Sequence, residues 1–90
     1  MATFEIRLLN LYIDFLNKHH HDGCVLNQSE RAGELRRHHA NCQILKRELQ
    51  SGRDPFNYRK YGAFGQTIPA MITSAKNSGY VVTDKCSCNR

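Results

Sequence analysis

The chain has 90 residues, of which 40% are hydrophobic and 23% are charged, and its formal net charge is +5. This length predicts one domain spanning residues 1–90, and the hydrophobic fraction excludes an intrinsically disordered chain. The longest apolar runs have two or three residues, which excludes a membrane span and predicts no membrane partner.

The first predicted element is a helix from Thr3, a candidate N-cap, to about Lys18. Apolar residues recur there at the three- and four-residue spacing of a helix face, at Phe4, Leu8, Leu11 and Phe15. Nine apolar residues fall within residues 4–16. We expect Leu8, Leu11 and Phe15 to be buried in the core or in a homodimer interface.

A second helix is predicted from about Gln28 to Gln50. Asn27 and Glu30 have the spacing of a capping box at its start, and the segment 51–55 breaks it. Its apolar stripe would consist of Leu35, His38, Cys42, Leu45 and Leu49.

Beyond Pro55, four aromatic residues fall within nine positions, at Phe56, Tyr58, Tyr61 and Phe64. A short third helix is predicted from Thr67 to about Asn77, with Pro69 in its first turn and Gly79 after its end. Residues 80–83 are β-prone. The predicted fold is mainly α, with a small α+β fold as the variant: three helices and a short C-terminal strand, stapled by zinc.

Zinc is expected because all five histidines and two of the four cysteines lie between residues 19 and 42, and the other two cysteines form a Cys-x-Cys. On a helix, residues four apart such as His38 and Cys42 share a face. Zn²⁺ takes four such ligands. We expect Cys24, His38, Cys42 and one of Cys86 or Cys88 to bind it. A second possible set of four ligands does not use the C-terminal cysteines. It consists of His20 or His21, Cys24, His38 or His39, and Cys42.

Two other interpretations of the cysteines remain open. Free thiols pack well as small apolar groups. Disulfides are disfavoured because residues 1–15 have no basic start and no cleavage site of a signal peptide, so an intracellular protein, cytoplasmic or nuclear, is expected.

The positive charge is concentrated in residues 31–60, where eight basic residues face three acidic ones, which gives +5. Aromatic rings can stack on unpaired bases while Arg and Lys neutralise phosphates. The predicted nucleic-acid contacts are Arg36, Arg37, Lys46, Arg47, Arg53, Tyr58, Arg59, Lys60 and Tyr61. Core packing is the alternative role for Tyr58 and Tyr61, and it is the expected role for Phe56 and Phe64.

Two functions follow from these patterns. The first is a small, basic, zinc-binding protein that binds RNA or single-stranded nucleic acid in a regulatory or accessory role, as in viral or phage accessory proteins. The second is a regulator or adaptor that docks on a protein partner, or dimerises, through the first helix. An enzyme is not expected, because the sequence has no phosphate-binding glycine loop, no paired carboxylates and no third member for a Cys–His pair.

Overall fold

The computed structural model describes residues 4–28 and 33–84, which form an α+β fold. These residues contain three α-helices and one five-stranded mixed sheet with the strand order β1-β4-β2-β3-β5. β5 pairs parallel to β3, and the remaining neighbours pair antiparallel. The elements are β1 (Glu5–Ile6), α1 (Leu9–Lys18), β2 (Gly23–Gln28), β3 (Glu34–His39), α2 (Gln43–Gln50), β4 (Lys60–Phe64), α3 (Ile68–Asn77) and β5 (Val81–Thr83), with 3₁₀ turns at Pro55–Asn57 and Gly65–Thr67.

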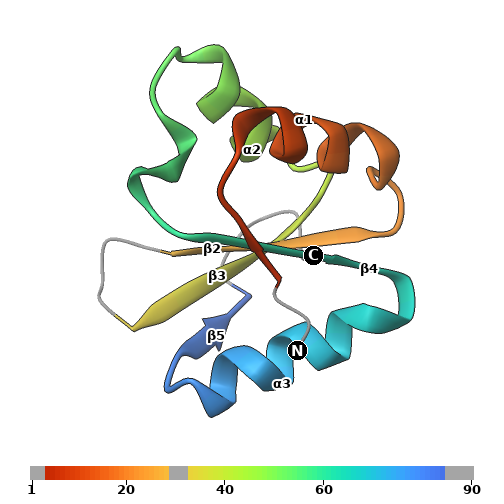
Figure 1. Ribbon diagram of the computed structural model, residues 1–90, viewed down its shortest axis with the longest axis vertical. Coiled ribbons are helices and arrows are strands. Elements are labelled where there is room, and N and C mark those ends of the chain that lie inside the picture. The colour runs from red at the N-terminus through yellow and green to blue at the C-terminus, as the bar shows by residue number, and fades with distance from the viewer. Residues whose placement is uncertain (1–3, 29–32, 85–90) are drawn as a thin grey trace.

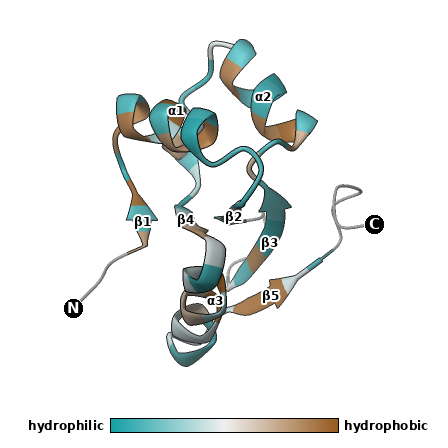
Figure 2. Ribbon diagram, turned by 90° about the vertical axis from the view of Figure 1, so that its right-hand side faces the viewer, coloured by the Kyte–Doolittle hydropathy of each residue, from teal (hydrophilic) through white to brown (hydrophobic). Residues whose placement is uncertain are grey.

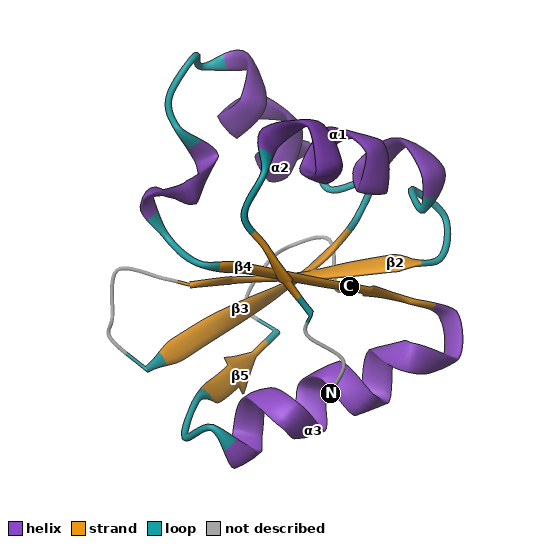
Figure 3. Ribbon diagram, viewed as in Figure 1, coloured by secondary structure: helices purple, strands orange, loops and turns teal. Residues whose placement is uncertain are grey.

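The sheet is the middle of three layers. Figures 1 and 3 show α1 and α2 on one face of the sheet and α3 on the other. Each face has its own hydrophobic cluster, because successive strand residues point to opposite faces. The cluster beneath α1 and α2 contains Tyr12, Leu16, Val25, Ala40, Cys42 and Leu45. The cluster beneath α3 contains Cys24, Leu26, Leu35, Ala63 and Met71.

The mainly α prediction is wrong, chiefly because residues 34–39 of the predicted helix over 28–50 form the strand β3, and the helical part among its described residues is α2. Residues 24–26 form a continuous, buried apolar run, which is typical of a strand covered on both faces. This strand pairs with β3 from Cys24–His39 to Gln28–Leu35. Leu35 and His38 therefore lie on opposite faces of a sheet instead of sharing a helix stripe. Asn27, the predicted helix cap, lies within β2, and Glu30 lies outside the described residues.

The first helix is shorter than predicted, since Glu5 and Ile6 pair with β4 as an edge strand. The predicted cap, Thr3, lies outside the described residues. Tyr12 and Leu16 are the α1 side chains that enter the core, whereas Leu8 and Leu11 are 58% and 54% exposed. Hydrophobic residues recur along α1 in Figure 2. Leu8 and Leu11 are therefore not in the core, so the homodimer interface is the predicted location that remains for them, and Phe15 is half-buried.

The helix and strand predicted near the C-terminus are confirmed as α3 and β5. Pro69 lies in the first turn of α3, and Gly79, with a φ of +92°, follows its last turn. The Thr67 hydroxyl donates a hydrogen bond to the Phe64 carbonyl, so it stabilises the preceding turn. No helix of the described residues is long and apolar enough to cross a bilayer.

Candidate functional site

The predicted zinc ligands are not brought together by the sheet. Cys24 lies in the cluster beneath α3, whereas Cys42 lies in the cluster beneath α1 and α2. His38 is on the Cys42 side, with its Nδ1 3.7 Å from the Cys42 Sγ. One ion therefore cannot take both Cys24 and Cys42, because a layer of backbone separates them. Cys86 and Cys88 lie outside the described residues.

The alternate histidines do not complete a site either. His39 is exposed and is the cross-strand neighbour of Cys24, on the opposite face from His38. His20 and His21 lie in the turn after α1. Within residues 4–28 and 33–84, no three side chains of His, Cys, Asp or Glu are placed to share a metal ion. The zinc-stapled fold is thus a wrong prediction.

His38 is instead a buried, neutral core residue. It is 3% exposed, and its pKa falls from 6.5 to about 4. Burial is the main cause, and the positive charges of Arg36 and Lys60 add to it. An imidazole that resists protonation can remain beside the Cys42 thiol and the apolar side chains without a counterion.

Lys60, a predicted nucleic-acid contact, is fully buried and so has no exposed surface to offer a phosphate. Its Nζ is 3.0 Å from Glu48 Oε1 and donates a 2.8 Å hydrogen bond to Asn27 Oδ1. The ammonium lies 5.8 Å from the centre of the Tyr12 ring. Burial lowers the pKa of Lys60, and Glu48 opposes that shift. This pair links α2 to β4 in the core, where no phosphate can reach it.

Tyr12 is the member of this buried group whose polar atom lacks both a hydrogen bond and an ion pair within residues 4–28 and 33–84. Its hydroxyl is fully buried and has no hydrogen-bond partner among the described residues. Burial raises the pKa of Tyr12 above its ordinary value, and the negative charge of Glu48 raises it further. Sequence reasoning missed Tyr12, Asn27 and Glu48, because nothing in their spacing distinguishes a buried polar residue from a surface one.

The other predicted nucleic-acid residues are divided among several places. Arg36 and Arg37 are adjacent on β3 and therefore point to opposite faces. Tyr61 lies beneath α3, with its ring centre 6.3 Å from that of Tyr80. Arg59 Nη1 lies 3.5 Å from the Tyr80 hydroxyl.

Three predicted residues do come together. Arg47, Arg53 and Tyr58 line one pocket of about 340 Å³ between α2 and the segment 51–58, which we call the basic pocket. Tyr58 is 42% exposed, and both arginines are exposed. Neither guanidinium forms an ion pair with another described residue.

The two carboxylates in the basic pocket are already engaged. Glu48 pairs with the buried Lys60, and Asp54 accepts a 2.9 Å hydrogen bond from the backbone N–H of Phe56. Lys60 compensates the charge of Glu48, so the two guanidinium groups face one uncompensated carboxylate, that of the exposed Asp54, and the basic pocket keeps a net positive charge. This excess of positive charge makes the basic pocket the candidate functional site.

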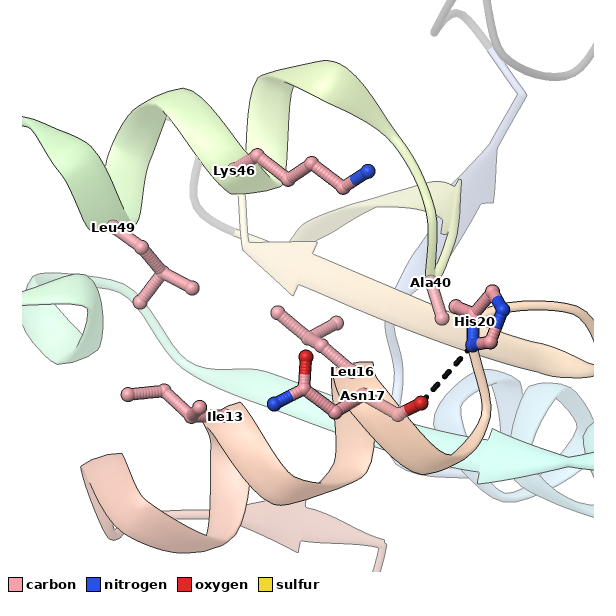
Figure 4. Close-up of a pocket in the computed structure, with 7 residues that line it drawn as sticks. All are labelled: Ile13, Leu16, Asn17, His20, Ala40, Lys46 and Leu49. Carbon is pink, nitrogen blue, oxygen red and sulfur yellow. Dashed lines mark hydrogen bonds between the residues drawn. The ribbon is translucent and has the colours of Figure 1, made fainter.

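A second pocket, of about 300 Å³, lies between α1 and α2 and is called the interhelix pocket. Its apolar lining comes from Ile13, Leu16, Ala40 and Leu49, and its polar lining comes from Asn17, His20 and Lys46. Figure 4 shows Ile13 and Leu49 facing each other from the two helices, and Lys46 extending toward the end where His20 and Ala40 lie. Lys46 was a predicted nucleic-acid contact, but it lies on the other side of α2 from the basic pocket.

Comparison with known proteins found no family model that matches this chain, and no similar curated protein or solved structure. The function of the two pockets is therefore inferred from the residues that line them.

Proposed function

We propose that this protein binds single-stranded nucleic acid, with the basic pocket holding one nucleotide. The observation that carries the proposal is the grouping of Arg47, Arg53 and the exposed ring of Tyr58 around one pocket whose carboxylates are engaged elsewhere. The chain's net charge of +5 also favours a polyanionic partner.

The residue types suit the parts of a nucleotide. A guanidinium can donate two parallel hydrogen bonds to a phosphate, and a tyrosine ring can stack on a base that has no pairing partner. A pocket of about 340 Å³ is at the small end of ligand sites, which favours one splayed nucleotide over the groove of a duplex.

The test is fluorescence anisotropy with a labelled single-stranded RNA over a range of salt concentrations. On a single strand, each phosphate that a basic side chain neutralises contributes ~0.7 to the slope of log affinity against log salt. The double variant Arg47→Gln/Arg53→Gln should therefore reduce the slope by about 1.4 and weaken binding at least ~10-fold. Tyr58→Leu should weaken binding without changing the slope, because it removes stacking and no charge.

The matched control is Arg7→Gln/Lys76→Gln, which removes the same two charges from exposed positions outside the pocket. It should keep nearly all of the affinity. Equal reductions of affinity in the two double variants would show that total charge alone drives binding, and would refute a pocket-specific site.

A second candidate, homodimerisation through α1, is favoured by one observation. Leu8, Leu9 and Leu11 are each about half exposed, which places three apolar side chains at the surface within about one turn at the start of α1. The α1 charges of Asp14 and Lys18 pair with each other at 3.4 Å, so two copies could meet there without like-charge repulsion. Sedimentation across a concentration range tests it: Leu11→Glu should abolish any dimer, and a wild type that stays monomeric would exclude it.

A further inference from the structure

The interhelix pocket combines an apolar interior with one uncompensated positive charge. Leu16 and Ala40 are buried in the core cluster, and Ile13 and Leu49 extend that apolar surface toward solvent. This lining can accept an alkyl chain or a small ring, because contact with it removes apolar surface from water.

The charge comes from Lys46 alone. Its ammonium forms no ion pair with any side chain in the described ranges, and no carboxylate is among the residues that line the pocket. The side chain of Asn17 also lines the pocket and carries a neutral hydrogen-bond donor. His20 is oriented by a 3.0 Å hydrogen bond from its Nδ1–H to the Asn17 carbonyl. In the neutral ring Nε2 is then an acceptor, so His20 supplies no hydrogen-bond donor to a carboxylate.

We infer that the interhelix pocket binds a small amphipathic monoanion: a carboxylate whose single alkyl or aryl tail lies between Ile13 and Leu49 and whose head group meets Lys46. The volume of about 300 Å³ is enough for one short tail but not for a peptide helix, whose diameter is about 10–12 Å. A cationic ligand would place a second positive charge beside Lys46. In a zwitterionic ligand, the positive group would offset the attraction between its negative group and Lys46.

This site is independent of the proposed nucleic-acid function. Lys46 and Arg47 are neighbours in sequence, but they line different pockets on two sides of α2. A ligand in the interhelix pocket would therefore contact α1, whereas a nucleotide in the basic pocket would contact the segment 51–58.

The experiment is a titration of ¹⁵N-labelled protein with decanoate, followed by amide chemical shifts. We expect saturable binding with the largest shifts at Ile13, Ala40 and Leu49. Nonyltrimethylammonium, which has the same nine-carbon tail and the opposite charge, should bind at least ~5-fold more weakly, and shortening the tail should weaken binding about 3- to 4-fold per methylene group.

Three variants separate the charge from the tail site. Lys46→Gln should weaken decanoate binding by about 3- to 5-fold, the upper part of the range for an exposed ion pair, and Lys46→Glu should reverse the preference between the two probes. Ile13→Ala, at a partly exposed position that should not prevent folding, should weaken both probes by about the same factor. Lys76→Gln on α3 is the control and should change neither.

The inference is overturned if the two probes bind equally well to the wild type, or if Lys46→Glu leaves their order unchanged. It is also overturned if the shifts spread over Leu8 and Leu11 without saturating, because that pattern describes general adhesion to the exposed surface of α1.

Discussion

Removing the buried charge of Lys60 tests the packing on which both pockets depend. Lys60→Met keeps an unbranched apolar stem of similar length but deletes the ammonium that contacts Glu48 and Asn27. The Glu48 carboxylate would then remain beside the Tyr12 ring without its partner. We expect the free energy of unfolding to fall substantially, although the protein should still fold.

The magnitude follows from burial. Breaking a fully buried ion pair by removing one partner costs about 3–5 kcal/mol, because the remaining charge is uncompensated. Here the Glu48 side chain is 28% exposed, so water can partly solvate it. We therefore expect a decrease of about 2–3 kcal/mol, at or below the lower end of that range. In the double variant Lys60→Met/Glu48→Gln, about 1–2 kcal/mol should be recovered, since no uncompensated charge remains.

The assay is equilibrium unfolding in urea, followed by far-ultraviolet circular dichroism. Arg59→Met is the matched control, because it deletes a positive charge one residue away at an exposed position and should change stability by no more than ~0.5 kcal/mol. An effect of Lys60→Met as small as that of the control would refute the buried pair. It would also return Lys60 to the set of residues available for nucleic acid.

Three further predictions concern the core. The pKa of His38 is about 4 in the folded chain and 6.5 as its ordinary value, so the unfolded state binds more protons between these pH values. Stability should therefore fall by about 2–3 kcal/mol as the pH drops from 6.5 to 4, and urea unfolding of His38→Gln should lack the part of this slope above pH 5. The decreases in stability of Cys24→Ala and Cys42→Ala should add within ~0.5 kcal/mol in the double variant, because the residues lie in separate clusters; strong coupling would indicate a shared ligand. Leu16→Ala should cost ~2–5 kcal/mol in thermal or urea unfolding of dilute protein, whereas Leu11→Ala should cost less than ~0.5 kcal/mol; equal costs would place Leu11 in the core.

The sequence predicted elements correctly where local signals and tertiary pairing agree. α3 is an example, because Pro69 and Gly79 mark its ends and its apolar residues face one cluster. Prediction failed over residues 34–42, where Leu35, His38 and Cys42 happen to have helical spacing. The deciding interactions there are the hydrogen bonds of β3 to β2 and β5, and β5 lies more than 40 residues further along the chain. Pairing between strands so far apart in the chain cannot be recognised from the residue pattern of one segment.

The difference between local sequence signals and non-local contacts also applies to the candidate sites. Arg47, Arg53 and Tyr58 were identified by residue type, but the fold decides which charges remain usable. Lys60 belongs to the same basic segment and is buried in the core, where it pairs with the Glu48 carboxylate that would otherwise neutralise the basic pocket.

This buried pairing gives α2 its role in the molecule. Leu45 and Leu49 pack against the core cluster and Glu48 pairs with Lys60, so the helix is held against the sheet by apolar contacts and an ionic one. The residues between them, Lys46 and Arg47, are consequently presented on two different sides. A change that weakened the contact between Glu48 and Lys60 would leave an uncompensated carboxylate beside Arg47. It would also allow α2 to move, and with it Lys46 in the interhelix pocket. If the two pockets bind ligands as proposed, the buried ion pair would therefore influence both sites without touching a ligand, because it holds α2, whose residues line both pockets, against the sheet.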